Sequence, residues 1–377
     1  MAQSGQEKLR VLMVLEAGDL YPSGIIRGLI YREYLERDGH FVKFVSRLNV
    51  PFVRLMNAPP RWLRLLQRFG VTSRLIEYIG RKLTHNTENT ALAMARGFDA
   101  VYMSKVTSFG FVERMRRATA ARIVLDFGDA IWLPRYRIER FDQLIRSVDA
   151  VTTDNVTTAE YAKQFNPNCT VIPDCPQVEV FDRARVRIAK RSNGDRIVIG
   201  WVGTRSTTYN LYVAWEGLER IFARHANLEL RLVGAAPGDL PPFERIRYTC
   251  TPSYDQAQMV EEVLRMDIGL FPLQDVEACR VRGVLKATVY MSGEAVAVCS
   301  PVGQCRDLIR DGINGMLAAT PDEWEAKIER LIADPSLRRR ITAEALSTVR
   351  SEFSVEKSYR RLRSVLDPSS PRVPADA

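Results

Sequence analysis

The pattern of residues 267–303 most constrains the fold of this 377-residue chain. Two apolar runs of strand length, one starting at Asp267 and the other at Ala295, flank a segment predicted to be a helix that begins near Gly283. A strand, a helix and a second strand in this order form a unit whose strands run parallel. The segment therefore predicts a parallel sheet, with ligands bound beyond the carboxyl ends of its strands.

The start of that predicted helix is rich in groups that bind anions. A helix start offers free backbone N–H groups and the positive end of the helix dipole, and both suit a phosphate. Basic side chains add to this positive field. The residues predicted to form this half of the site are Arg282, Gly283, Val284 and Lys286.

A second loop is predicted to reach the same edge of the sheet. The apolar run 197–202 is a predicted strand, and the next four residues are Gly203, Thr204, Arg205 and Ser206. Gly203 lets the backbone approach a ligand closely, and the other three supply hydrogen-bond donors. The alternative for Arg205 and for Lys286 is an ordinary solvated charge on a loop.

Strand and helix patterns alternate along the whole chain, which is too long for one ordinary core. We expect an α/β protein with an N-terminal Rossmann-like domain over residues 1–185. A charged segment without apolar periodicity, 186–195, is the predicted linker. Residues 196–366 are the predicted C-terminal Rossmann-like domain, and residues 367–377 are expected to be disordered.

Two carboxylates lie at the end of a predicted strand in the first half. Asp126 ends the apolar run 122–127, and Asp129 follows it closely. In α/β folds this is a position for catalytic groups, so both are candidate catalytic residues. The alternative is a structural role, such as helix capping by Asp129.

The formal charge of +9 is confined to the first half of the chain. Residues 1–190 hold 29 basic and 20 acidic residues, whereas residues 191–377 hold 25 of each. Within this half, residues 51–83 carry seven Arg or Lys against one acid, Glu77, interleaved with large apolar side chains. Such a stretch can lie on an anionic membrane surface. The alternative is a pair of helices packed on the core, and no nucleic-acid-binding motif accompanies the charge.

We expect the chain to remain in the cytoplasm, or to lie peripherally on the inner face of the membrane. No apolar run reaches membrane-spanning length, and the first ten residues lack a signal-peptide core. The six cysteines form no CxxC pair, and the three histidines show no metal-ligand spacing, so no metal is expected.

The order of motifs from residue 196 to about 365 resembles the C-terminal domain of family-4-like glycosyltransferases, the group 1 glycosyl transferases. The sequence GWVGTRST at 200–207 is similar to the first strand and loop of that domain. Tyr290-Met291, the SPVG that ends at Gly303 and the DGxNG turn at 311–315 follow in the same order. The resemblance implies a GT-B architecture, in which two Rossmann-like domains face each other across a cleft.

The resemblance also implies a function. A nucleotide-diphosphate sugar would bind the C-terminal domain, and the acceptor, a glycan, a lipid-linked molecule or a small molecule, would bind the N-terminal domain. Transfer would be metal-independent, would need no cofactor and would retain the anomeric configuration. Many relatives place a histidine where acceptor and sugar meet, and Asp126 occupies the comparable strand end here.

The chain departs from the family pattern at the ribose contact. A glutamate pair common in relatives falls at Val281 and Val289, and either Glu277 or Glu294 could replace it. Two other functions therefore stay open. One is a donor-binding protein without transfer activity, and the other is a nucleotide-sugar 2-epimerase, which shares the architecture.

Overall fold

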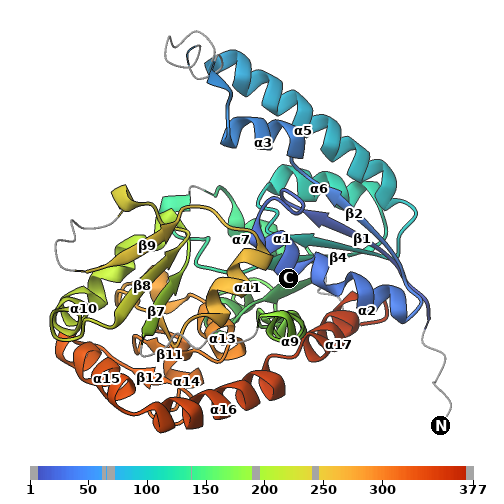
Figure 1. Cartoon of the computed structure of the whole chain (residues 1–377). Helices are drawn as coiled ribbons and strands as arrows, with labels where there is room; N and C mark the ends of the chain where they lie inside the picture. Colours follow the sequence, from blue (N-terminus) through green and yellow to red (C-terminus); the bar gives the residue numbers. More distant parts are fainter. Residues whose placement is uncertain are drawn as a thin grey trace, which may run out of the picture. The chain divides into compact units, whose positions relative to one another are not determined.

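The computed structural model describes residues 7–61, 65, 73–136, 138–188, 196–239 and 246–370. The chain divides into two compact units (Figure 1). Unit 1 combines Met1–Pro173 with Val355–Ala377, and unit 2 is Asp174–Ser354. In the described part of the chain each unit contains one six-stranded sheet, and every strand pairing is parallel.

The sheet of unit 1 has the order β2-β1-β3-β4-β5-β6. Its central strands are mostly apolar and buried on both faces, as expected for a parallel sheet covered by helices. The strands are β1 (Arg10–Leu15), β2 (Phe41–Ser46), β3 (Ala100–Ser104), β4 (Arg122–Phe127), β5 (Ala150–Thr153) and β6 (Cys169–Val171).

The α-helices of unit 1 include six short ones and the long helix α5, and the last helix of the chain joins them. In order they are α1 (Pro22–Arg27), α2 (Arg32–Arg37), α3 (Val50–Asn57), α5 (Ser73–Ala95), α6 (Phe109–Ala118), α7 (Phe141–Arg146), α8 (Val156–Lys163) and α17 (Val355–Leu366). The sequence pattern predicts a single helix over residues 25–37, whereas the structure has two α-helices there, α1 and α2. Gly28 lies between them, and a Cβ there would come within 2.5 Å of the Leu15 side chain. The chain therefore bends where its backbone packs directly on β1.

The sheet of unit 2 has the order β12-β11-β10-β7-β8-β9. Its strands are β7 (Ile197–Val202), β8 (Leu228–Val233), β9 (Tyr248–Thr251), β10 (Ile268–Phe271), β11 (Val296–Cys299) and β12 (Met316–Leu317). Its α-helices are α9 (Val178–Arg187), α10 (Tyr212–Arg224), α11 (Gln256–Leu264), α12 (Glu277–Arg280), α13 (Leu285–Ser292), α14 (Cys305–Leu308), α15 (Pro321–Ala333) and α16 (Pro335–Glu352). Two apolar clusters, one on each side of the sheet, form its core. The predicted α/β class is confirmed.

Two helices do not follow the expected domain boundaries. Helix α9, expected in the N-terminal domain, packs against α11 and belongs to unit 2. Helix α17, expected in the C-terminal domain, contacts β3 and β4 of unit 1. The apolar face of a helix is visible in a sequence, but the sheet on which it packs is not. Of the predicted linker, residues 189–195 lie outside the described residues.

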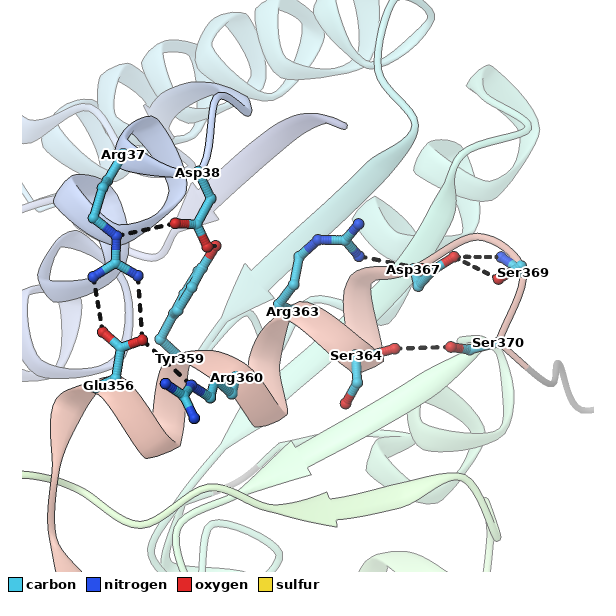
Figure 2. A pocket seen from close by; sticks show the side chains of 10 residues that line it. All are labelled: Arg37, Asp38, Glu356, Tyr359, Arg360, Arg363, Ser364, Asp367, Ser369 and Ser370. Carbon is cyan, nitrogen blue, oxygen red and sulfur yellow. Dashed lines mark hydrogen bonds and ion pairs between the residues drawn. The ribbon is translucent and has the colours of Figure 1, made fainter. Parts of the chain in front are cut away.

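Helix α17 buries an apolar face, and polar contacts with the rest of unit 1 add to its attachment (Figure 2). The Tyr359 hydroxyl donates to Asp38 at 2.7 Å, and Arg37 forms an ion pair with Glu356 at 2.9 Å. The chain stays ordered beyond the helix, because Arg122 on β4 donates to the Ser370 carbonyl at 2.8 Å. The first residues of the tail predicted to be disordered therefore belong to unit 1, and residues 371–377 lie outside the described residues.

His40 connects this helix to the edge of the sheet. The Leu9 N–H lies 3.0 Å from its Nδ1, and the Arg363 Nε–H lies 3.0 Å from its Nε2. A neutral ring can accept at one nitrogen, whereas a protonated ring can accept at neither. Burial, followed by the charge of Arg363, lowers the pKa of His40, and the nearby Asp38 carboxylate opposes this.

Acidification is therefore expected to loosen the attachment of α17. Below about pH 6.5 His40 is protonated in the unfolded chain, but its lowered pKa keeps it largely unprotonated in the native state. The free energy of unfolding therefore decreases as the pH decreases. A His40→Gln variant lacks this titration. Urea unfolding of both proteins at pH 7.5 and pH 5.5 should show the larger loss in the wild type. An equal decrease in the free energy of unfolding in the two proteins would show that His40 is not the titrating group.

The basic segment 51–83 is only partly described, because residues 62–64 and 66–72 lie outside the described residues. Helix α3 and the start of α5 lie within it. A Cβ added to Gly80 would lie 2.7 Å from the Phe52 ring, so these two helices pack together. Among the described helices, none is long and apolar enough to cross a membrane.

Candidate functional site

The loops that follow β7 and β10 meet at the carboxyl edge of the unit 2 sheet. These strands are parallel neighbours, with Ile199 opposite Ile268. Helix α13 begins at Leu285, two residues after the predicted start. A Cβ built on Gly203 would lie 2.8 Å from Lys286 Nζ, so the loop after β7 and the start of α13 are in direct proximity. The structure thus brings together the two segments that the sequence predicted to share one site.

Lys286 lies over two aromatic rings at this edge of the sheet. Its Nζ lies 4.6 Å from the ring centroid of Trp201 and 5.7 Å from that of Phe271. Ring faces attract a cation but provide no counter-charge. Burial, followed by the charge of Arg282, lowers the pKa of the Lys286 ammonium to about 7. In the described part of the chain no carboxylate forms an ion pair with it.

Arg282 lies beside Lys286, and no carboxylate forms an ion pair with it within the described residues. Its Nε is buried and finds no hydrogen-bond partner in the described structure. Leaving such a donor unsatisfied costs free energy, and two neighbouring cations repel each other. An anion bound between them would satisfy both groups. The first turn of α13 adds backbone N–H groups and the positive end of a dipole.

Aromatic hydroxyls hold these loops in place. Tyr290 on α13 donates to the Leu270 carbonyl at 3.0 Å and accepts from the Val202 N–H at 2.8 Å, which joins the helix to β10 and β7. Tyr254 donates to the Gly203 carbonyl at 2.9 Å. Sequence reasoning missed Trp201 and Tyr254, since an aromatic in or near an apolar run looks like an ordinary core residue. Tyr290 was recognised only as part of a motif.

Gly203 is required by its protein neighbours. A Cβ there would lie 2.3 Å from the Trp201 ring. Gly234 follows β8 with φ of +88°, and a Cβ on it would lie 1.9 Å from the Gly203 carbonyl oxygen. The two loops thus touch backbone to backbone, which only glycine allows. Thr204 and Ser206 follow, and their hydroxyls lie 3.0 Å apart on the exposed side of the loop.

Arg205 is engaged elsewhere. Its guanidinium forms a bidentate ion pair with Asp239, with an Nη2–Oδ1 distance of 2.6 Å, and the side chain is 71% exposed. The pair lowers the pKa of Asp239, whose carboxylate also accepts from the Ala236 N–H. The structure therefore joins Lys286 and Arg282, while it directs Arg205 to the loop after β8.

The remaining predicted residues of unit 2 differ in accessibility. Val284 is buried in the core beside α13, so only its backbone could meet a ligand. Glu294 follows the C-terminal end of α13 and forms an ion pair with Arg185 at 3.1 Å. Lys286 lies in the first turn of that helix, so Glu294 is at the opposite end. Glu277 is exposed on α12, so it is better placed than Glu294 for the expected contact with the ribose.

Asp126 is a core residue of unit 1. It is fully buried, and Arg27 holds it through Nε at 2.8 Å and Nη2 at 2.5 Å. The hydroxyls of Ser104 and Thr152 donate to it at 3.0 and 2.7 Å. Four donors occupy its carboxylate oxygens, so it has no lone pair directed at a substrate. The structure contradicts the prediction that Asp126 contacts the acceptor.

Asp129 has a different environment. It follows β4 with φ of +62°, its side chain is 42% exposed, and it forms an ion pair with Lys105 at 3.2 Å. Lys105 follows the adjacent strand β3 with φ of +55°. Left-handed conformations of such residues are uncommon and often mark functional sites. The accessible carboxylate at this sheet edge is therefore that of Asp129.

No group of three or more potential ligands for a metal ion occurs among the described residues. The groups of unit 2 suited to an anion are Lys286, Arg282 and the start of α13.

Comparisons with known proteins relate part of this chain to a family. Residues 196–334 match the family model of the glycosyl transferases group 1. None of the curated protein sequences matches the chain.

Solved structures are similar over nearly the whole chain. A glycosyltransferase from Rickettsia africae has a TM-score of 0.64 at 14% identity, with 96% of this chain and 98% of that chain covered. HepE of Anabaena in complex with UDP-glucose has a TM-score of 0.63 at 13% identity, with 94% and 99% covered. The α,α-trehalose 6-phosphate synthase of Burkholderia multivorans has a TM-score of 0.66 at 13% identity, with 96% of each chain covered.

The matched residues contain β7, β10 and α13, the elements that bring Lys286 and Arg282 together. The similar structures cover both units and confirm the predicted fold class. Residues 196–334 thus match the group 1 glycosyl transferases, and the two parallel-sheet units of the chain have the GT-B fold of the similar structures.

Proposed function

We propose that this protein is a glycosyltransferase that moves a sugar from a nucleotide-diphosphate sugar to an acceptor. The observation that carries the proposal is the cation pair of Lys286 and Arg282, which lacks a carboxylate partner in the described structure. A diphosphate supplies the charge that this site lacks. The family match over residues 196–334 supports the same chemistry.

The site would act on the leaving group. As the bond between the anomeric carbon and the diphosphate breaks, negative charge grows on the diphosphate oxygens. The acceptor hydroxyl bonds to that carbon and passes its proton to the departing diphosphate. Fixed cations and a helix start stabilise such charge without a metal. Lys286 has a pKa of about 7, so binding of the diphosphate would raise that pKa and draw in a proton. We extend the retaining outcome to this chain by resemblance.

The proposed donor is a hexose linked to a nucleoside diphosphate. HepE, which shares the fold, was crystallised with UDP-glucose. The proposed donor-binding residues are Gly203, Thr204, Arg205, Ser206, Arg282, Gly283, Val284 and Lys286. Arg205 would join this set by exchanging Asp239 for a phosphate oxygen, which the exposure of its side chain permits.

Asp129 is the proposed acceptor-side residue of unit 1. If its carboxylate orients the acceptor or stabilises positive charge on the sugar, Asp129→Asn should lower turnover by about 10²-fold. Donor affinity should not change, because the donor residues belong to unit 2. Steady-state kinetics and calorimetry would measure both. Asp142→Asn, an exposed carboxylate of the same unit, is the matched control, and equal turnover in the two variants would contradict this role.

The proposed acceptor is lipid-linked, and the proposed partner surface is an anionic membrane. Unit 1 carries the excess positive charge, concentrated in residues 51–83. Basic residues near such a surface each contribute about 1 kcal/mol of attraction at low salt. We therefore propose a cytoplasmic protein that lies peripherally on the membrane.

A second candidate is a donor-binding protein without transfer activity. The observation in its favour is that buried valines, Val281 and Val289, stand where relatives carry a glutamate pair. Such a protein would bind the diphosphate through the same cations, yet it would hold the ribose weakly.

One experiment separates the candidates. The protein is incubated with a panel of nucleotide-diphosphate sugars and membrane extract, and nucleotide release and the sugar product are measured. Release that depends on the extract supports transfer. Binding without release supports the second candidate, and an epimerised nucleotide-sugar would show an epimerase. If no member of the panel binds in calorimetry, the proposal is wrong.

A further inference from the structure

Helix α5 of unit 1, the long helix labelled in Figure 1, carries exposed apolar side chains near its start. Leu75, Tyr78 and Ile79 are 58%, 57% and 39% exposed, and their spacing places them on one side of the helix. Leu55 on α3 is 41% exposed. Thirteen large apolar side chains are exposed among the described residues, and five of them fall within residues 55–79. This concentration distinguishes the segment from the rest of the surface.

The opposite side of α5 is the side that packs. Gly80 lies about 150° around the helix from the centre of the exposed face, at 100° per residue. It contacts Phe52 of α3, because a Cβ there would lie only 2.7 Å from that ring. The exposed residues therefore do not serve the pairing of the two helices. A helix that is apolar on both sides is normally covered on both.

The charge around this face indicates what covers it. Five exposed basic side chains accompany a single exposed acid, Glu77. The five are Arg54, Arg61, Arg74, Arg81 and Lys82. Arg54 pairs with Asp19 at 3.2 Å, and the other four make no ion pair within the described residues. A protein surface would have to match this charge with carboxylates, whereas an anionic lipid surface offers negative headgroups above an apolar layer.

We propose that Leu75, Tyr78 and Ile79 insert into the headgroup region of an anionic lipid membrane, with the surrounding basic residues on the phosphates. Apolar area in the acyl boundary and charge at the headgroups are the two components of such binding. Leu55 on the neighbouring helix α3 widens the same apolar surface. The inference deepens the proposed function, because it names the surface at which unit 1 would meet a lipid-linked acceptor.

Flotation with phosphatidylglycerol–phosphatidylcholine vesicles tests the proposal without any transfer reaction. The wild type should float with anionic vesicles and stay behind with pure phosphatidylcholine. The triple variant Leu75→Ser, Tyr78→Ser and Ile79→Ser should partition onto anionic vesicles at least about tenfold more weakly than the wild type. Replacing Arg74, Arg81 and Lys82 by Gln should reduce partitioning by about 100-fold at low salt.

A matched control removes exposed apolar residues elsewhere. Its three substitutions are Val156→Ser, Val186→Ser and Ile313→Ser, at side chains that are 58%, 87% and 51% exposed. This control should float like the wild type. All variants replace exposed side chains, so their thermal melts should match the wild type, and the affinity for a nucleotide-diphosphate sugar in solution is measured by calorimetry beside flotation. Loss of flotation with intact donor binding separates this surface from the donor site.

Three results would overturn the inference. If the wild-type protein remains in the bottom fraction with anionic vesicles at low salt, it has no membrane affinity. Equal flotation of the wild type and the apolar variant would show attraction by charge alone, without insertion. A wild-type dimer in gel filtration that the apolar variant dissociates would show that a second copy of the chain covers this face.

Discussion

Replacing Lys286 by methionine is expected to weaken binding of a nucleotide-diphosphate sugar by about 10- to 150-fold, the effect of losing a charged hydrogen bond. The same change should raise the melting temperature of the free protein. Burial and Arg282 lower the pKa of Lys286 to about 7, so the fold bears the cost of this cation. A residue whose removal improves stability and impairs binding has been kept for function. Calorimetry and thermal melts measure the two effects.

The pH dependence of donor binding provides a second measurement of the same group. A protonated Lys286 binds the diphosphate best, so affinity should fall as the pH rises above about 7, by about fivefold from pH 7 to pH 8. The nucleotide-sugar is the right probe, because its phosphates are esterified and do not titrate in this range. Binding at pH 8 should also take up protons from the buffer.

Lys286→Arg is the matched control, since it keeps the charge but does not titrate. Its donor affinity should be flat across this range. If the wild type is equally flat and takes up no proton, Lys286 does not contact the diphosphate. Stability has the opposite slope: an unfolded chain holds a proton on this lysine up to about pH 10.4, so the wild type should gain stability from pH 7 upward.

Breaking the buried ion pair of unit 1 is expected to cause the largest loss of stability. Asp126→Ala leaves the Arg27 guanidinium, only 3% exposed, without its carboxylate. Removal of one partner from a buried pair costs about 3–5 kcal/mol. Chemical denaturation would measure this loss as a lower midpoint. The double variant Arg27→Met with Asp126→Leu should recover much of it, because apolar side chains can fill the same space.

This prediction also decides the role of Asp126. If Asp126→Asn melted like the wild type and lost turnover by about 10²-fold, the carboxylate would be catalytic after all. The contacts with Arg27, Ser104 and Thr152 instead predict that stability falls first.

The sequence predicted the parts of the fold that depend on local pattern. The strands of both sheets are apolar runs, and the helices after Thr320 and Asp334 begin with a capping side chain followed by proline. The sequence also located the loop at Gly203 and the cations at the start of α13. These are positional rules, because the end of a parallel strand identifies the edge where ligands bind.

The rest depended on contacts between residues far apart in the chain. Asp126 and Asp129 look alike in a sequence, and only Arg27, 99 positions before Asp126, shows that one of them is structural. Likewise, the low pKa of Lys286 follows from burial beside Arg282, over the ring of Trp201, 85 positions earlier. No local pattern contains the fact that α17 packs on β3 and β4.

That last packing has a consequence for how the protein is made. Unit 1 combines residues that precede unit 2 with residues that follow it, since the buried Arg122 on β4 donates to the carbonyls of Val365 and Ser370. Unit 2 is continuous and can fold during synthesis. Unit 1 must instead wait, with part of its core open, until helix α17 has been synthesised. A chain shortened at residue 354 would keep a complete unit 2 and an unfinished unit 1, so a chaperone or a protease should recognise the earlier half of the molecule.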